Sequence, residues 1–317
     1  MLLEMPRPTI LLVHGRSFKP PERELKRFWI AALRCGLERD RPEAVEAFNR
    51  ANRELVYYGD LSNGYLLSIG ETYDMLSDLA DRRACHADLV RRRRGDFGRD
   101  DYRRLPGRNA YREFLADTLG RPLSALRLTD RLVTMVSPDM AQYWNRDEAF
   151  GSEVRATMSV PLARALRRKG PVLLIAHSLG AVVAYDTLWK FSRTGEYRPE
   201  FSDRRIDLWI TIGSPLSDET VRRHLRGSAA TGPRQFPANV RRWANVSAED
   251  DFIAHDETAI DDYRDMIEAG LVETIEDHQI YNLAVRRGTS NPHSSAGYLM
   301  HPTVTGLVAD WLMQPLG

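Results

Sequence analysis

The chain has 317 residues, of which 45 are Lys or Arg and 44 are Asp or Glu, so its formal net charge is +1. This balance gives no overall field that would attract nucleic acid or an anionic membrane. The 43% of hydrophobic residues are enough for a buried core, whereas the two cysteines are too few for a disulfide framework or a cysteine-rich zinc site. No apolar run reaches the roughly 18 to 20 residues of a membrane-spanning helix, and no signal-peptide pattern is seen. We therefore expect a soluble, cytoplasmic protein.

The N-terminal part alternates predicted strands and helices. Residues 9–13 are a continuous apolar run, typical of a strand buried on both faces, and they are followed by His14-Gly15. Helical patterns follow at 22–39 and 42–53, and a short strand is predicted at 54–58. This order indicates strands joined by helical crossovers.

Residues 61–138 interrupt the alternation. They are rich in Arg and Asp, and their helical patterns are confined to 73–90 and 110–119. We predict a largely helical insertion, because the segment is too long for a simple loop. Its arginines, among them Arg82, suit a phosphate or an anionic lipid headgroup, but the interleaved aspartates favour a solvated surface. Nucleic acid is disfavoured, since aromatic residues do not line up with the basic ones.

The alternation resumes after the insertion. Strands are predicted at 171–175, 206–212 and 242–246, helices at 153–168, at 179–190 and from 298 or 301 to 312, and a weaker strand pair at 271–275 and 279–283. The pattern predicts an α/β fold with a mostly parallel central sheet flanked by helices, in a single domain that spans residues 1–317.

The sharpest chemical signal is Ala176-His177-Ser178-Leu179-Gly180, which lies between a predicted strand and a predicted helix. It fits the G-x-S-x-G nucleophile turn, with Ala at the first glycine position. Small residues on both sides allow a tight turn that projects the serine hydroxyl at a helix N-terminus, where negative charge is favoured. Ser178 is the predicted nucleophile, and the alternative interpretation is a chance turn of small residues.

A serine nucleophile needs a base and an acid that orients it. His293 is the predicted base because it lies in a loop rich in turn-forming residues before the last helix, and His301 is the alternative. Asp251 is the predicted acid because it follows the strand at 242–246. Asp250 and Asp218 remain open alternatives.

Backbone N–H groups near the nucleophile would bind the oxyanion of the reaction. The residue after the nucleophile, Leu179, is one predicted donor. The second is Arg16 or Gly15, after the first strand, with Arg16 favoured. We interpret the neighbouring His14 as structural.

Together these motifs resemble the α/β-hydrolase superfamily, and within it the lipase-like serine esterases. The resemblance rests on His14-Gly15, Ala176-His177-Ser178-Leu179-Gly180, Gly213-Ser214-Pro215, Asn245-Val246 with Asp251, and Asn291-Pro292-His293. Phe252-Ile253 stands where these lipases commonly have Pro-Val. The resemblance covers residues 9–60 and 139–317. It implies a Ser–His–Asp triad without a cofactor, and a cap formed by residues 61–138.

The expected function is that of a serine hydrolase that cleaves carboxylic esters of a lipid or another small acyl compound. No metal is expected, because no His, Asp or Glu cluster has a suitable ligand spacing. The sequence leaves peripheral membrane contact open. Alternatives with the same triad are a thioesterase, an amidase or a phospholipase, and a further alternative is a non-catalytic interaction protein with this fold.

Overall fold

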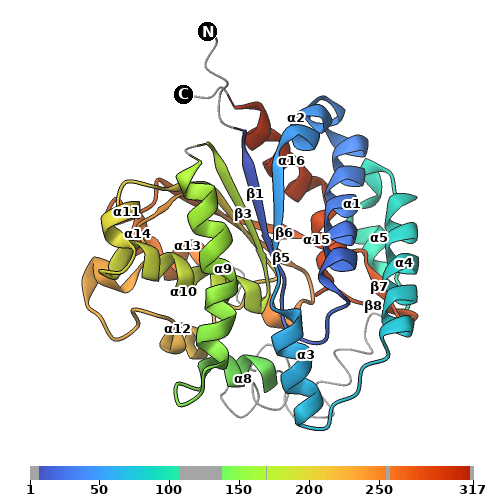
Figure 1. Cartoon of the computed structure of the whole chain (residues 1–317). Coiled ribbons are helices and arrows are strands. Elements are labelled where there is room, and N and C mark those ends of the chain that lie inside the picture. The colour runs from blue at the N-terminus through green and yellow to red at the C-terminus, as the bar shows by residue number, and fades with distance from the viewer. Residues whose placement is uncertain (1–6, 108–137, 169, 255–257, 315–317) are drawn as a thin grey trace.

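The computed structural model describes residues 7–107, 138–168, 170–254 and 258–314, and its centre is a parallel sheet (Figure 1). The strands lie in the order β2-β1-β3-β4-β5-β6. Their bounds are β1 Thr9–Val13, β2 Asn52–Val56, β3 Val172–His177, β4 Ile206–Ile212, β5 Val240–Ala248 and β6 Thr274–Ile280. A small antiparallel hairpin is formed by β7 Val285–Arg286 and β8 Thr289–Ser290.

Helices cover both faces of the sheet. On one face α1 packs against α4, α15 and α16, and on the other α9 packs against α10 (Figure 1). The helices of the N-terminal half are α1 Glu22–Asp40, α2 Val45–Arg50, α3 Gly59–Ser68, α4 Met75–Val90, α5 Arg99–Arg103 and α8 Pro138–Trp144. Those that follow are α9 Phe150–Arg167, α10 Leu179–Arg193, α11 Arg198–Phe201, α12 Glu219–His224, α13 Ala259–Asp262, α14 Arg264–Glu268, α15 Ser295–Leu299 and α16 Pro302–Met313. Short 3-10 turns occupy Pro42–Ala44, Arg94–Asp96, Gly232–Gln235 and Phe252–Ala254.

The first strand explains why the core has two halves. Leu11 and Val13 point into the cluster beneath α9 and α10, and Ile10 and Leu12 into the cluster beneath α1 and α16. All four side chains are buried, so the continuous apolar run marks a strand covered on both faces, as predicted.

The strand order determines where a ligand site can form. The chain moves outward from β1 to β2 in one direction and from β3 to β6 in the other. Val13 pairs in register with Val56 and with Ala176, so the carboxyl ends of β1 and β3 lie side by side. In open α/β sheets, ligands bind at the point where the strand order reverses, because the loops there diverge. That point lies between the segments that carry Gly15 and Ser178.

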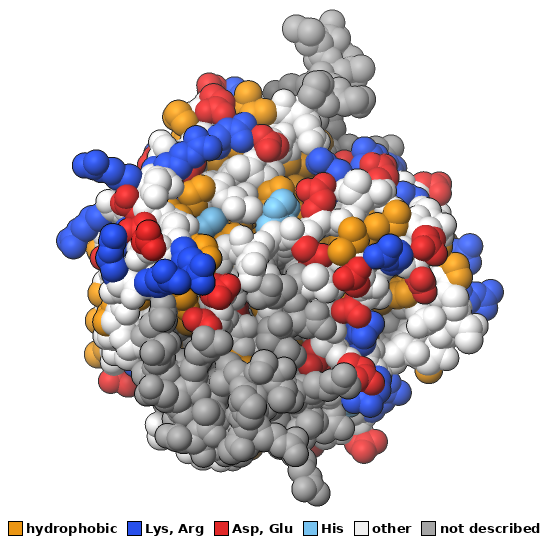
Figure 2. Space-filling model, turned by 180° about the vertical axis from the view of Figure 1, so that it is seen from behind, with side chains coloured by type: hydrophobic (Ala, Val, Ile, Leu, Met, Phe, Trp, Pro, Cys, Tyr) orange, Lys and Arg blue, Asp and Glu red, His pale blue; other side chains and the backbone are white. Residues whose placement is uncertain are grey.

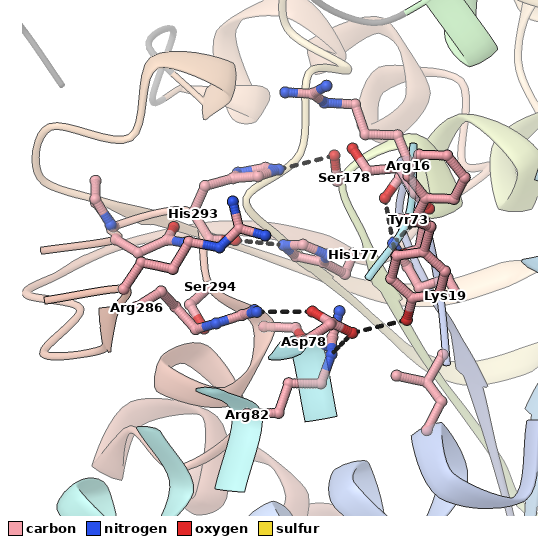
Figure 3. Close-up of a pocket in the computed structure, with 18 of the residues that line it drawn as sticks. Arg16, Lys19, Tyr73, Asp78, Arg82, His177, Ser178, Arg286, His293 and Ser294 are labelled. Atoms are coloured by element: carbon pink, nitrogen blue, oxygen red, sulfur yellow. Dashed lines mark hydrogen bonds and ion pairs between the residues drawn. The ribbon is translucent and has the colours of Figure 1, made fainter. Parts of the chain in front are cut away.

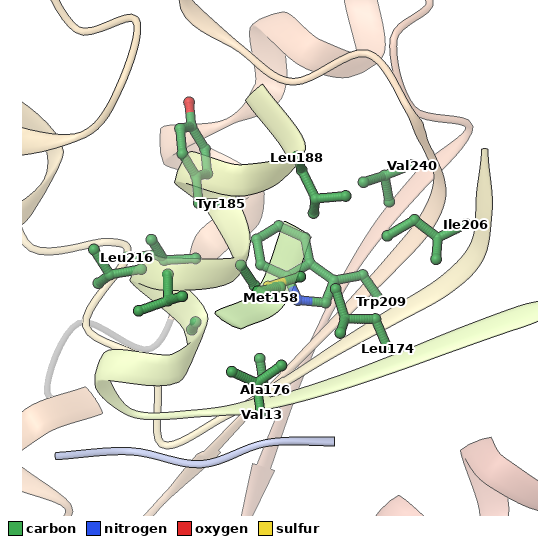
Figure 4. Close-up of a cluster of buried hydrophobic side chains, with 14 of the residues drawn as sticks. Val13, Met158, Leu174, Ala176, Tyr185, Leu188, Ile206, Trp209, Leu216 and Val240 are labelled. Atoms are coloured by element: carbon green, nitrogen blue, oxygen red, sulfur yellow. The ribbon is translucent and has the colours of Figure 1, made fainter. Parts of the chain in front are cut away.

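Buried apolar side chains surround Trp209 in the core beneath α10 (Figure 4). The rings of Trp209 and Trp243 are 4.6 Å apart, and both side chains are fully buried. The indole N–H of Trp243 donates to Thr211 Oγ1 at 2.9 Å, so this polar atom has a buried partner. This packing gives β3 and α10 a rigid base on which the turn at Ser178 is built.

Most predicted elements are confirmed with small shifts at their ends, but the predicted strand pair at 271–275 and 279–283 is wrong. A single strand, β6, occupies Thr274–Ile280 at the edge of the sheet. The centre of β6 consists of polar residues, Glu276 to Gln279, and such a run is more typical of a turn than of a strand. However, Asn245 Nδ2 donates to Asp277 Oδ1 at 2.9 Å and holds that residue beside β5. The predicted helix at 42–53 ends at Arg50, and β2 begins at Asn52.

The described part of the predicted insertion is helical. The pattern at 73–90 corresponds to α4, which packs against α1 and β7, whereas the pattern at 110–119 lies outside the described residues. Basic and acidic side chains are mixed on the face that carries α4 and α5 (Figure 2), and Arg92 and Arg104 form ion pairs with Asp88 and Asp101. Arg92 and Arg104 are therefore neutralised at the surface by aspartates of α4 and α5.

Gly180 allows the close contact between α10 and β1. A Cβ atom at this position would lie 2.4 Å from the His14 carbonyl oxygen and 2.7 Å from that of Val13. We therefore expect Gly180→Ala to lower the free energy of unfolding by about 2 kcal/mol, because the helix must move off the strand. Urea denaturation measures this change. The matched control is Gly306→Ala in α16, where a Cβ meets no atom within 4 Å and Ala stabilises a helix by up to about 1 kcal/mol. Equal effects of the two changes would contradict the argument.

Candidate active site

Ser178 occupies a strained turn between β3 and α10. Its backbone has φ 55° and ψ −128°, a region that side-chain-bearing residues rarely adopt. A Cβ on Gly15 would lie only 2.7 Å from Ser178 Cβ, so the glycine allows the loop after β1 to approach the turn. The Ser178 N–H donates to the Ile212 carbonyl at 3.2 Å, which ties the turn to β4. The packing around the turn thus maintains a conformation that is unfavourable in isolation.

Three side chains from distant parts of the chain form a hydrogen-bonded series at this turn. His293 Nε2 lies 2.9 Å from Ser178 Oγ, and its Nδ1 lies 2.9 Å from both carboxylate oxygens of Asp251 (Figure 3 shows the first contact). Asp251 follows β5, and His293 lies between β8 and α15. These distances are those between a nucleophile, its base and an orienting acid.

Asp251 is a buried carboxylate surrounded by donors. Besides His293, it accepts hydrogen bonds from the Tyr298 hydroxyl at 2.6 Å and from the Ile253 N–H at 3.0 Å. Burial by itself would raise its pKa, but the charge of His293 and these hydrogen bonds outweigh burial, so the pKa is lowered. An ionised Asp251 places the proton of a neutral His293 on Nδ1 and leaves Nε2 as the acceptor for the serine hydroxyl.

The alternative site residues have other structural roles. Asp250 accepts a hydrogen bond from the Tyr102 hydroxyl at 2.8 Å. Asp218 caps α12 by accepting from the N–H groups of Thr220 and Val221, and His301 caps α16 by accepting from the Thr303 N–H. Among the candidates, Asp251 and His293 are the pair brought to Ser178.

Gly213 makes room for the His293–Asp251 pair. It follows β4 with φ 54°, and a Cβ there would lie 3.0 Å from Asp251 Oδ2 and 3.2 Å from His293 Nδ1. The glycine therefore permits both a left-handed backbone and the close approach of the two side chains. The Gly-Ser-Pro sequence after a predicted strand is the signal that identifies this position.

Lys19 organises the loop that carries the predicted oxyanion donors. Its Nζ donates to the carbonyls of Arg16 and Phe18 and, at 3.0 Å, to that of Ser17. From the opposite side, the Ser17 N–H donates to Asp139 Oδ2 at 2.7 Å. Sequence analysis did not identify Lys19, because a lysine in a loop is normally exposed to solvent.

The predicted donor residues surround the serine. Gly15 is in contact with Ser178, Arg16 follows it in the Lys19-bound loop, and Leu179 is the first residue of α10. The first N–H groups of a helix have no acceptor within the helix, so that of Leu179 suits an oxyanion. The role of these three residues as donors stays a prediction.

His177 supports the loop that carries His293. Its Nε2 lies 2.9 Å from the His293 carbonyl oxygen, which can only accept, so Nε2 carries the proton. The two imidazole rings are 4.7 Å apart. Burial, followed by the charges of His293 and Lys19, lowers the pKa of His177 well below its usual value. A neutral His177 thus holds the backbone of His293 in place.

Buried neutral histidines predict a loss of stability in mild acid. Burial and the charge of Arg39 lower the pKa of His301 to about 3, and burial also lowers the pKa values of His14 and His177. Below the usual histidine pKa of about 6.5, the unfolded chain therefore binds more protons than the folded chain, and the free energy of unfolding falls. His301→Asn keeps an acceptor for the Thr303 N–H but does not titrate.

We expect the loss of stability of His301→Asn between about pH 7.5 and about pH 5.5 to be smaller than that of the wild type by about 1 kcal/mol. Urea denaturation at the two pH values measures the difference. An unchanged pH dependence would show that His301 is not a buried neutral group.

A cavity of about 570 Å³ opens beside Ser178 and His293. One part of its wall is aromatic and includes Phe18, Trp29 and Tyr73. A charged part is formed by α4 and the β7–β8 hairpin, and it meets the aromatic part where the Tyr73 hydroxyl donates to Asp78 (Figure 3). The site therefore combines a hydrogen-bonded serine with a cavity large enough for a small molecule.

Comparison with family models, with curated proteins and with solved structures finds no significant match. Within the described residues, no group of three or more His, Cys, Asp or Glu side chains is placed to hold a metal ion. In the same part of the chain, none of the helices has the length and apolar character needed to cross a membrane. The geometry around Ser178 is therefore the feature from which a function can be inferred.

Proposed function

We propose that the chain is a serine hydrolase of the α/β-hydrolase type that cleaves carboxylic esters. The observation that carries this proposal is the unbroken series from Asp251 through His293 to Ser178, built at a strained strand-to-helix turn. A structural serine would not require a backbone of positive φ beside a histidine–carboxylate pair. Strain of this kind is retained where the surrounding packing enforces it, and it is concentrated at functional sites.

In the proposed reaction, Ser178 Oγ attacks the ester carbonyl while its proton passes to His293 Nε2. Asp251 keeps the imidazole oriented and stabilises its protonated form. The N–H groups of Leu179 and of Arg16 or Gly15 bind the oxyanion of the tetrahedral intermediate. His293 then donates the proton to the leaving alcohol, and a water molecule activated by His293 hydrolyses the acyl-enzyme.

The proposal is tested with a fluorophosphonate probe followed by hydrolysis of a series of 4-nitrophenyl esters. The expected result is labelling of Ser178 in the folded wild type, hydrolysis of the esters, and an optimum acyl length set by the cavity. A folded wild type that is neither labelled nor active on any ester of the series would overturn the proposal and favour a non-catalytic role.

A further inference from the structure

The cavity wall formed by α4 and the β7–β8 hairpin carries two arginines on one shared aspartate. Arg82 Nε donates to Asp78 Oδ2 at 2.7 Å, and a terminal nitrogen of Arg286 donates to Asp78 Oδ1 at 2.8 Å. Asp78 also accepts from the Tyr73 hydroxyl at 2.9 Å, and Arg286 forms a second ion pair with Asp81. Figure 3 shows this group facing the cavity below His177. The two guanidinium groups are therefore held in fixed positions.

Within the described residues, both arginines keep N–H groups that donate to no protein acceptor. In the described parts of the chain, Arg82 donates through Nε alone, and Arg286 through Nε and one terminal nitrogen. Their side chains are 17% and 18% exposed, and both residues line the cavity. The remaining N–H groups thus reach the cavity from side chains whose conformational freedom is already restricted. A planar guanidinium presented in this way is suited to bind a carboxylate or a phosphate.

The charge balance of the wall agrees with an anionic ligand. Four arginines line the cavity, Arg16, Arg82, Arg286 and Arg287, against two aspartates, Asp74 and Asp78. Asp81 and Asp139 are not among the lining residues, and they bind Arg287 and Ser17 through their backbone N–H groups. Because solvent screens these half-buried arginines only in part, their electrostatic attraction for a ligand oxyanion is stronger than it would be at an exposed site.

We propose that the substrate carries a compact oxyanion, a carboxylate or a phosphate, which Arg82 and Arg286 bind while Ser178 attacks the ester. This inference rests on the proposed function and specifies its substrate class. The charged groups share one cavity with Ser178 and His293, so one small molecule can reach both. The aromatic lining residues contribute apolar contact.

The experiment compares two esters of equal acyl length, the mono-4-nitrophenyl ester of adipic acid and 4-nitrophenyl hexanoate. The expected kcat/KM is about tenfold or more higher for the adipate ester, as a charge-assisted hydrogen bond to arginine implies. Adipate and inorganic phosphate are tested as inhibitors of hexanoate hydrolysis, which detects an oxyanion on either side of the ester bond. The stronger inhibitor distinguishes a carboxylate from a phosphate.

Arg82→Gln should reduce the preference for the adipate ester and weaken inhibition by the oxyanions about tenfold. The matched control is Arg83→Gln, because Arg83 is the next residue of α4 and is exposed. This variant removes the same charge and should leave the adipate preference and the oxyanion inhibition unchanged. If Arg82→Gln does not fold, Arg82→Lys replaces it, because lysine keeps the charge without the planar guanidinium. Arg82→Lys should reduce the adipate preference and weaken oxyanion inhibition, but by less than tenfold.

Hexanoate hydrolysis without any adipate preference or oxyanion inhibition would overturn this inference and leave the proposed function intact. If Arg82→Gln and Arg83→Gln reduced the adipate preference and the oxyanion inhibition equally, the inference would also be overturned, because this result would indicate a general effect of charge. Absence of both turnover and fluorophosphonate labelling would overturn the inference together with the function.

Discussion

Ser178→Ala is expected to lower kcat/KM for 4-nitrophenyl esters by at least about 10⁴-fold and to abolish fluorophosphonate labelling. The change removes the oxygen that lies 2.9 Å from His293 Nε2 and leaves the cavity and the oxyanion loop in place. Steady-state kinetics and labelling measure the effect. The control is Ser202→Ala, an exposed serine after α11, which should keep full activity. Substantial turnover by folded Ser178→Ala would show that Ser178 is not the nucleophile.

The same position provides a separate test of strain. Alanine at position 178 retains the conformational free-energy penalty of φ 55°, whereas glycine adopts this conformation without strain. We therefore expect Ser178→Gly to be inactive and more stable than Ser178→Ala by about 1 kcal/mol, after allowance for the greater freedom of glycine in the unfolded chain. Thermal or urea denaturation gives this difference. A less stable glycine variant would mean that the turn is not strained.

Asp251→Asn is expected to lower kcat by about 10³- to 10⁴-fold with little change in the fold. The asparagine amide is nearly isosteric, but it removes the negative charge that stabilises protonated His293. It also allows His293 to adopt the tautomer in which Nε2 carries the proton and cannot accept one from Ser178. Ester kinetics measure the loss, and circular dichroism shows whether the variant folds.

Two neighbouring acids provide matched controls for Asp251→Asn. Asp250→Asn changes the residue that binds Tyr102, and Asp218→Asn keeps an oxygen that can cap α12, so both should retain activity. If Asp250→Asn or Asp218→Asn lowered kcat more than Asp251→Asn does, that residue and not Asp251 would be the acid that orients His293. Tyr298→Phe should lower kcat by less than Asp251→Asn but by more than the two control variants. It removes one hydrogen-bond donor to Asp251 and leaves the buried Ala248 N–H without its acceptor.

Local patterns in the sequence were sufficient for much of the fold. The run at 9–13 and the strand at 206–212 were predictable because a strand buried on both faces is formed mostly of apolar residues. The polar edge strand β6 was mispredicted, since its pairing with β5 depends on contacts such as that between Asn245 and Asp277 rather than on its own composition.

The sequence was sufficient to select Ser178 and a few alternatives for its base and its acid, among which the hydrogen bonds of the folded chain favour His293 and Asp251. Ser178 and Asp251 could be selected because each follows a predicted strand, and the carboxyl ends of parallel strands share one edge of the sheet. His293 could be selected because it lies in a loop rich in turn-forming residues before the last helix. Only the tertiary structure decided which groups support them. The contact of His177 with the His293 carbonyl spans 116 residues, and that of Arg286 with Asp78 spans 208. Such pairs have no local signature, because they arise from the packing of separate elements whose relative positions no short segment encodes.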